Sequence, residues 1–207
     1  MAVITSYSTL LTEVANWTAR SDLTSYIPGF VQLWEEEFYN DSENWGAWME
    51  TALSATITSN VAAVPSDYLG LKIAYISGQV SAPLKRISLD QLYQRYPRAN
   101  AVSSAPAYIA RNGSNFEFGP IAGDGTLLGT YYAKPTLLRS DADGSNFLIT
   151  DCPDICLYGS LLAATPFLQN DKRIPTWQMM YNQAVVSYRN RFKEEDYSGS
   201  PPHTVVV

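Results

Sequence analysis

The spacing of apolar residues changes twice along the chain, and this change constrains the fold more than any other feature. Near both ends, apolar residues recur every three or four positions, which is the period of an amphipathic helix. Four segments have this pattern, around residues 7–17, 27–38, 151–168 and 173–194. Between residues 49 and 148 the period is two, which is typical of half-buried strands. The sequence therefore predicts an α+β fold in which a β-rich part interrupts a helical part.

The two helical pairs are far apart in the sequence, and each pair alone buries little apolar surface. We expect them to close on each other as a helical bundle formed by residues 1–48 and 150–195. Residues 49–149 would then form an inserted, antiparallel β-rich lobe. Residues 196–207, which contain glycine and two prolines, would form an extended carboxyl-terminal tail.

The segment of residues 151–168 is apolar nearly all round, so we expect it to be a central helix. Pro166 is expected to bend or end it, because proline has no N–H to donate within a helix. The segment of residues 173–194 has the most regular apolar stripe. The bundle core predicted from these patterns contains Leu10, Val14, Trp17, Trp34, Tyr158, Leu161, Phe167, Trp177, Tyr181 and Tyr188.

Turn and cap signals divide the β-rich part. Asn112-Gly113 lies between two apolar runs, and Asn-Gly is the strongest short hairpin signal. Ser88 predicts the start of a short helix over residues 89–96, since serine is a favoured residue at a helix N-cap.

The sequence offers little catalytic chemistry. His203 is the one histidine, so His-based catalysis, a His zinc ligand and a Ser-His-Asp triad are disfavoured. The sequence also contains no phosphate-binding glycine loop. Cys152 and Cys156 lack the spacing of a redox pair and are predicted to be small buried hydrophobes. The longest uncharged runs have 16 residues, too few to span a bilayer. We therefore predict a binding or structural protein that is not an enzyme, with no catalytic residue, metal, cofactor or membrane contact.

The net charge of −6 is unevenly distributed. Residues 21–71 contain eight acidic and no basic residues, whereas residues 72–139 contain eight basic and three acidic ones. A net negative chain does not favour tight binding of a nucleic acid backbone. The charge split instead predicts two surfaces of opposite sign.

Several motifs in the same order resemble the head-to-tail adaptor (connector) proteins of short-tailed bacteriophages. At the amino-terminal end they are Tyr7–Leu11 and Ile27–Val31. Cys152–Leu168 is similar to the family's third helix, and residues 171–177 together with Tyr181 are similar to its last helix. Val64–Leu69 is similar to the family's step into the β lobe. The sequence departs from the family at three consecutive glutamates, where the second helix of the family usually carries basic residues.

The resemblance implies a virion structural protein that is assembled in the host cytoplasm. Copies would form a homo-oligomeric ring of about twelve below the portal protein, at the head-to-tail interface. This ring would extend the channel, through which DNA passes without sequence-specific binding, and would dock tail proteins such as nozzle or fibre proteins. In related adaptors the carboxyl-terminal segment reaches the portal. The portal-binding residues implied here are Tyr197, Pro201, Pro202, His203, Val205, Val206 and Val207.

In a closed ring, each copy presents different faces to its two neighbours. Successive residues on a helix are about 100° apart, so Glu35, Glu36 and Glu37 cannot share one face and are expected to form a solvated or partner-facing edge. These glutamates on the acidic side, and Lys85 and Arg86 on the basic side, are the predicted subunit contact.

One alternative function stays open, which is a carbohydrate- or receptor-binding β module of a virion or cell surface. Its support is the abundance of tyrosine and tryptophan, which are enriched at binding surfaces. A peptidoglycan hydrolase would need paired carboxylates in a cleft, and the sequence places none.

Overall fold

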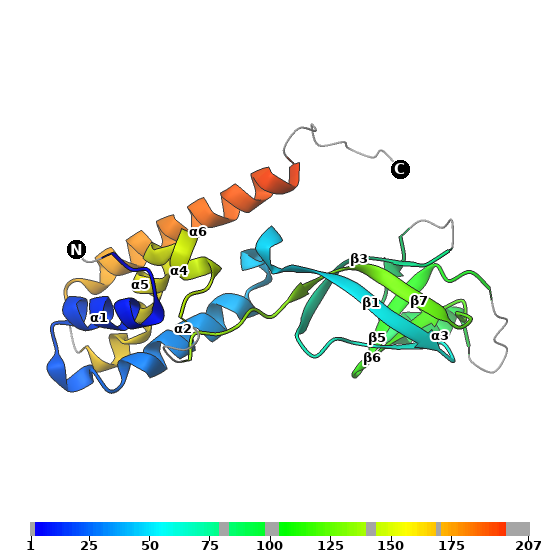
Figure 1. The fold of residues 1–207 in the computed structure, drawn as a ribbon, viewed down its shortest axis with the longest axis horizontal. Coiled ribbons are helices and arrows are strands. Elements are labelled where there is room, and N and C mark those ends of the chain that lie inside the picture. Colours follow the sequence, from blue (N-terminus) through cyan, green and yellow to red (C-terminus); the bar gives the residue numbers. More distant parts are fainter. Residues whose placement is uncertain (1–2, 79–82, 98–103, 140–143, 169–170, 198–207) are drawn as a thin grey trace. The chain divides into compact units, whose positions relative to one another are not determined.

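The structure is a computed structural model that describes residues 3–78, 83–97, 104–139, 144–168 and 171–197. Within these residues there are six α-helices and one seven-stranded sheet, so the predicted α+β class is confirmed (Figure 1). The chain divides into two compact units. We call Met1–Trp48 with Pro135–Val207 the helical unit, and Met49–Lys134 the β unit.

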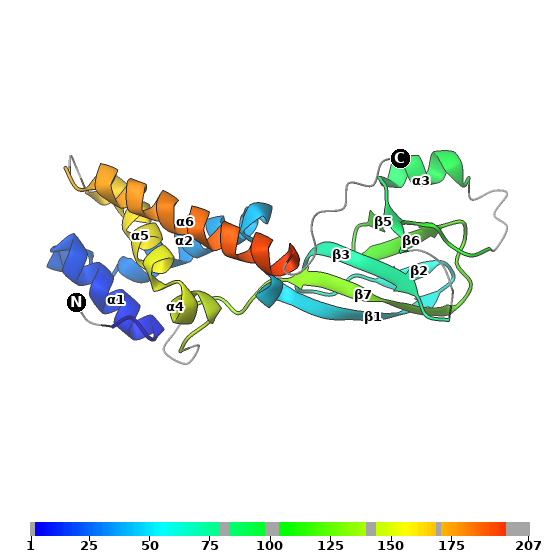
Figure 2. The ribbon, with the colours of Figure 1, turned by 90° about the horizontal axis from the view of Figure 1, so that it is seen from above.

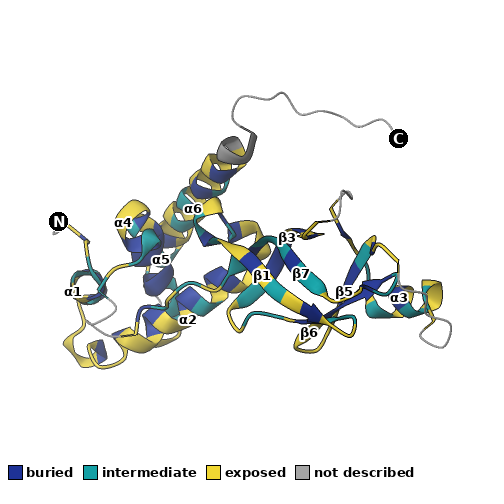
Figure 3. Cartoon of the chain, turned by 45° about the vertical axis from the view of Figure 1, so that its right-hand side comes forward, coloured by how far each residue is buried: buried dark blue, intermediate teal, exposed yellow. Residues whose placement is uncertain are grey.

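Four α-helices in the described part of the helical unit pack against a fifth, α5. The helices are α1 (Tyr7–Thr18), α2 (Ile27–Asn40), α4 (Phe147–Asp151), α5 (Pro153–Ala163) and α6 (Ile174–Tyr197). Figures 1 and 2 show α5 beside α1, α2 and α6, and it contacts each of the four. Since α5 is apolar on every side, a place among the other helices buries the most apolar surface. Its buried residues include Ile155, Cys156, Leu157 and Leu161. Figure 3 shows α5 mostly in the colours of buried and intermediate residues.

Local sequence signals set the helix ends. The Ser6 side chain accepts a hydrogen bond from the backbone N–H of Thr9, and the Thr9 hydroxyl accepts one from the backbone N–H of Ser6. This capping box starts α1. Pro28 lies in the first turn of α2, where its missing N–H has no intrahelical partner to lose. At the other end of α5, Pro166 lies in a short 3₁₀ helix, η6 (Thr165–Phe167), which confirms that the helix ends before it.

Two stacked rings join the residue at which the chain leaves the helical unit to the first residue of α4. Trp48 and Phe147 lie with their ring centroids 4.7 Å apart and their planes at 16°. The Trp48 Nε1–H donates a hydrogen bond of 2.9 Å to the hydroxyl of Tyr188 on α6. Phe147 also contacts Phe192 of α6, with a centroid distance of 5.9 Å. The end of the first part of the helical unit and the start of α4 are therefore both packed against α6.

The β unit contains one sheet with the strand order β3-β7-β1-β2-β6-β5-β4. Its strands are β1 (Glu50–Thr58), β2 (Val61–Ala63), β3 (Tyr68–Ile76), β4 (Lys85–Arg86), β5 (Tyr108–Asn112), β6 (Asn115–Gly119) and β7 (Gly125–Ala133). Neighbouring strands are antiparallel except β4 and β5, which are parallel. The prediction of an antiparallel lobe is wrong at this edge. The helix α3 (Leu89–Arg95) lies between β4 and β5 in the sequence, and a connection that contains a helix allows two strands to pair in parallel.

The sheet curls so that strands far apart in its order share one core. The ring of Tyr68 on β3 meets the ring of Phe116 on β6, with a centroid distance of 5.5 Å. The buried cluster takes residues from β1, β2, β3, β5, β6 and β7, among them Leu53, Leu71 and Ile109. Along β1, the buried residues Leu53 and Ile57 are separated by exposed or half-buried ones, as the two-residue period predicts.

Two local predictions in the β unit are confirmed. β5 and β6 form a hairpin in which Asn112 pairs with Asn115, and Gly113 has a φ of 60°, which glycine adopts at no steric cost. Ser88 starts α3, where its hydroxyl accepts a hydrogen bond from the backbone N–H of Gln91.

The chain segment after β7 differs from the prediction. Pro135–Leu138 and α4 lie in the helical unit, although the sequence analysis placed residues 135–149 in the β-rich lobe. Leu138 and Leu148 are buried, and this burial explains why the segment packs with helices. Residues 198–207, which make up most of the predicted tail, lie outside the described residues.

The residues predicted for the bundle core differ in burial. Leu10, Val14, Trp34, Leu161, Trp177 and Tyr188 are buried, and Trp17, Tyr158 and Tyr181 are half-buried.

Phe167 was expected in the core, but it is 43% exposed. It lies in η6 after the end of α5, and its ring packs on Tyr26 and Phe30 at the edge of the unit.

Candidate interaction site

The three consecutive glutamates of α2 have different environments. Glu35 is completely buried, and its carboxylate accepts hydrogen bonds from the backbone N–H of Leu138 at 2.9 and 3.2 Å and from the side-chain amide of Asn146 at 3.2 Å. A buried carboxylate is tolerated when such donors satisfy it. The prediction that Glu35 lies at a subunit contact is therefore wrong. It holds the chain segment that returns from the β unit.

Glu36 and Glu37 are on the accessible side of α2. Glu36 forms an ion pair of 2.7 Å with Arg139. Glu37 is exposed and forms no ion pair with any residue that the structure describes. Of the three glutamates, Glu37 is thus the one whose charge is available to another molecule.

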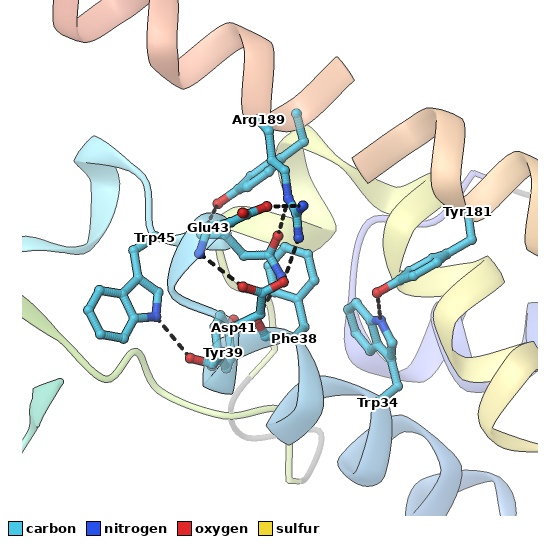
Figure 4. A network of polar contacts seen from close by, with 10 residues as sticks. Trp34, Phe38, Tyr39, Asp41, Glu43, Trp45, Tyr181 and Arg189 are labelled. Atoms are coloured by element: carbon cyan, nitrogen blue, oxygen red, sulfur yellow. Dashed lines mark hydrogen bonds and ion pairs between the residues drawn. The ribbon is translucent and has the colours of Figure 1, made fainter. Parts of the chain in front are cut away.

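An arginine cluster joins α6 to the end of α2 (Figure 4). Arg189 donates from Nε to Asn44 Oδ1 at 2.8 Å, from Nη2 to Asp41 Oδ2 at 2.6 Å, and from Nη1 to the carboxylate of Glu43. The neighbouring Tyr188 hydroxyl donates to the backbone carbonyl of Asn44 at 2.7 Å. These contacts fix the short 3₁₀ helix η2 (Ser42–Asn44) on α6.

This cluster was not predicted from the sequence. Arg189 and its three partners are separated by about 145 positions in the sequence, and no motif connects them. Asp41 starts η2 by accepting a hydrogen bond from the backbone N–H of Glu43, which is a local cap signal that does not involve Arg189.

Replacing Arg189 with alanine should lower the free energy of unfolding of the helical unit by about 1–2 kcal/mol. The loss is moderate because the carboxylates of Asp41 and Glu43 are partly solvated. Urea denaturation at low and high salt measures it, and the loss should be smaller at high salt. Lys193→Ala, which removes an exposed cation from the same helix, is the matched control and should change stability by less than about 0.5 kcal/mol. Equal effects of the two variants would contradict a specific role for Arg189.

Two adjoining cavities lie between α2 and α6, and we call them together the α2–α6 groove. The larger has a volume of about 340 Å³ and is lined by Asp41, Val186 and Arg189 among others. The smaller has a volume of about 190 Å³, and its lining includes Gly159 of α5. Glu37 and Tyr181 line both cavities. The groove therefore has an accessible carboxylate at its middle.

Tyr181 contributes a hydroxyl to the groove. The Trp34 Nε1–H donates a hydrogen bond of 3.2 Å to this hydroxyl (Figure 4). Burial raises the pKa of Tyr181 above its usual value, so the phenol keeps its proton at neutral pH. Because its oxygen already accepts from Trp34, its own O–H can donate to a bound group.

The predicted basic residues lie in the β unit. Lys85 and Arg86 form β4, the last strand at one edge of the sheet. Both side chains are exposed, and neither forms an ion pair with a described residue. They are the most accessible pair of adjacent cations in the described part of this unit.

The two units have opposite net charges. The helical unit contains 15 acidic and 7 basic residues, a net charge of −8, and the β unit contains 5 acidic and 7 basic residues, a net charge of +2. The boundary between the units therefore separates an acidic part of the chain from a basic part. Opposite net charges of this kind favour association between an acidic and a basic surface.

Both cysteines, Cys152 and Cys156, are buried and form no disulfide. Burial raises the pKa of Cys152 to about 11 and that of Cys156 well above its usual value, so both are thiols at neutral pH. In the described ranges, no three His, Cys, Asp or Glu side chains come together to hold a metal ion. None of the described helices is long and apolar enough to cross a bilayer.

The predicted portal-binding residues lie at the end of α6 and in the residues after it. Tyr197 is the last residue of α6, and its side chain is not among those described. Pro201, Pro202, His203, Val205, Val206 and Val207 lie outside the described residues.

Two units of opposite net charge and a groove with an exposed acidic residue are features through which protein chains bind one another. The family model of the SU10 adaptor protein matches residues 5–205, nearly the whole chain. The chain belongs to this family of phage head-to-tail adaptors, which confirms the resemblance seen in the sequence. The family is a structural one, and its members are virion components. No curated protein matches the sequence.

Proposed function

We propose that the chain forms a ring of about twelve copies below the portal, extends the DNA channel and docks tail proteins. The observation that carries this proposal is the family match over residues 5–205, which includes the helical unit, the β unit and nearly all of the tail. A ring of this kind needs no catalytic residue, metal or cofactor, because its work is to hold other proteins in place. Assembly takes place in the host cytoplasm before the ring enters the virion.

The net charge suits a channel through which DNA passes. About twelve copies with a charge of −6 each give a ring charge of roughly −72 when all groups are ionised. Negative walls repel the phosphates of DNA, so they favour passage over retention. This ring contacts DNA without reading its sequence.

The contact between neighbouring copies uses the charge difference between the units. Each copy presents two different faces in a closed ring, so an acidic face can meet a basic face at every contact. Glu36 and Glu37 remain on the acidic side of this proposal, while Lys85 and Arg86 supply the basic side. Glu35 is excluded from it by its burial.

The tail from Tyr197 to Val207 binds the portal in this proposal. Its final residues, Thr204–Val207, have high β propensity, and an extended segment of this kind can add to the sheet of a partner or lie in a groove. The fixed φ of Pro201 and Pro202 removes backbone freedom from the unbound tail, which would reduce the entropy lost on binding.

Deleting residues 197–207 should abolish binding to the portal protein of the same phage while leaving the ring intact. Pull-down of purified portal measures the binding, and native mass spectrometry with negative-stain images measures the ring. The full chain should form a ring and retain the portal. The amount of portal retained by the shortened chain should be about one tenth of that amount or less. The melting temperature of both forms shows whether the deletion affects folding.

The rival function makes the opposite prediction. If the full chain binds members of a glycan array, and neither forms rings nor retains the portal, it is a carbohydrate-binding module instead. Equal retention of the portal by the full and shortened chains would leave the ring standing but would remove the tail as its portal contact.

A further inference from the structure

The α2–α6 groove has the chemistry of a site for a basic side chain. Its larger cavity is bordered by the carboxylates of Glu37 and Asp41, and Glu43 lies in the same cluster as Asp41. Arg189 is the one guanidinium that lines it, and all three of its donor nitrogens are already used by Asn44, Asp41 and Glu43. The groove therefore has an excess of negative charge that the described residues do not neutralise.

The walls of the groove fit the apolar stem of such a side chain. Val185 and Val186 of α6 line the larger cavity, and Val186 is 56% exposed. Leu162 and Ala163 of α5 line the smaller one, together with the carboxylate of Glu37 and the amide of Gln178. Lysine and arginine bury their methylene groups against apolar surface and keep their charged ends near acceptors. A carboxylate at the middle of a partly apolar groove is suited to this arrangement, because a charge-assisted hydrogen bond is roughly twice as strong as a neutral one.

We propose that this groove receives the edge strand β4 of a second copy of the chain, and that Glu37 binds Lys85 or Arg86 of that copy. The proposal rests on the ring assembly of the proposed function and names its contact. Charge complementarity favours a second copy as the occupant. Lys85 and Arg86 lie exposed at a sheet edge of the basic β unit, and Glu37 is an exposed acidic residue of the helical unit that lines both cavities of the groove. Every copy of a ring then offers one groove and one basic edge.

The geometry of a strand limits which cation enters. Adjacent residues of a strand point to opposite faces, so one of Lys85 and Arg86 enters the groove while the other points away from it. A variant that changes both residues therefore removes the interaction whichever of the two enters the groove. Since β4 is only two residues long and is flanked by the buried Leu84 and the half-buried Ile87, this edge presents two charges on a fixed backbone.

Charge reversal tests the proposal. Native mass spectrometry of the full chain should show about a tenfold or greater loss of ring for Glu37→Lys, and a similar loss for the double variant Lys85→Glu with Arg86→Glu. A chain that carries all three changes should recover the ring, because the charges are then exchanged. Gln32→Lys is the control, since it adds a positive charge to α2 at a residue that lines neither cavity. It should assemble as the unchanged chain does. Equal melting temperatures exclude unfolding as the cause.

A cross-link identifies the occupant. A Glu37→Cys chain is mixed with an Arg86→Cys chain and a Lys85→Cys chain in turn, so that a disulfide between the two labelled positions can form only between copies. The expected result is a cross-linked pair with at least one of them, and none when Gln32→Cys replaces Glu37→Cys. Cross-linking of Glu37→Cys to a portal or tail protein in place of a second copy would overturn the assignment.

The outcomes separate this proposal from the proposed function. If the unchanged chain forms rings and Glu37→Lys forms them equally well, the groove is not the contact, but the ring stands. If the unchanged chain forms no ring with its portal present, the proposed function itself fails. Loss of the ring in both reversals without recovery in the combined variant would show that the two sites do not meet.

Discussion

Replacing Gly159 with alanine should lower the free energy of unfolding of the helical unit by about 3 kcal/mol. A Cβ at this position would overlap Nε1 and Cδ1 of the Trp34 indole. Trp34 is buried and donates a hydrogen bond to Tyr181, so its ring cannot move aside without breaking contacts on α6. The close approach of α5 and α2 therefore depends on the absence of a side chain at residue 159. Urea denaturation followed by tryptophan fluorescence and by circular dichroism measures the loss.

Gly29→Ala provides the matched control for this prediction. Gly29 lies in α2, and a Cβ there meets no atom within 4 Å. Alanine has the higher helix propensity, so this variant should gain about 0.5–1 kcal/mol. A loss of similar size in both variants would show that the effect is not a clash with Trp34. The indole fluorescence of Gly159→Ala should also change, since its hydrogen bond to Tyr181 would be disturbed.

Replacing Glu35 with leucine should have an effect of similar size, a loss of about 3 kcal/mol in the free energy of unfolding. The leucine side chain cannot accept the hydrogen bonds that Leu138 and Asn146 donate to the carboxylate. A buried backbone N–H without an acceptor is costly, and the returning chain segment would lose its anchor. Hydrogen exchange at the Leu138 amide reports on this segment directly, and its protection should fall together with the stability.

Two companion variants sharpen this test. Glu35→Gln keeps one oxygen that can accept from Leu138, so its loss should be nearer about 1 kcal/mol. Glu37→Leu removes an exposed carboxylate two positions further on and should change stability by less than about 0.5 kcal/mol. A Glu35→Leu chain as stable as the unchanged protein would contradict the role of this carboxylate as an anchor.

Much of the secondary structure could be predicted from the sequence because its signals are local. The stripe of apolar residues from Ile174 onward predicted α6, and the capped start at Ser88 predicted α3. Proline at 166 predicted the end of α5. Each of these depends on residues a few positions apart, whose spacing alone determines whether a helix can bury its apolar face.

The candidate site could be predicted only in part, because its contacts join distant segments. The charge split indicated where opposite surfaces lie, but it could not distinguish Glu35 from Glu37. That difference depends on Leu138, which is 103 positions away from Glu35 and supplies the donor that makes burial tolerable. The Arg189 cluster was missed for the same reason, since its partners are near the end of α2. The parallel pairing of β4 with β5 likewise has no signature in two residues.

The stacked pair of Trp48 and Phe147 has a consequence for the way such a protein can evolve. The first and last strands of the β unit pair with each other, Glu50 lying opposite Tyr132, so the unit begins and ends at one place. In the helical unit, Trp48 is the last residue before the β unit, and its ring stacks on Phe147, twelve residues after the chain returns at Pro135. Both rings pack on α6. An insertion with neighbouring ends can be exchanged for another without moving a helix. We therefore expect that the β unit can be exchanged for another inserted unit while the helices keep their packing.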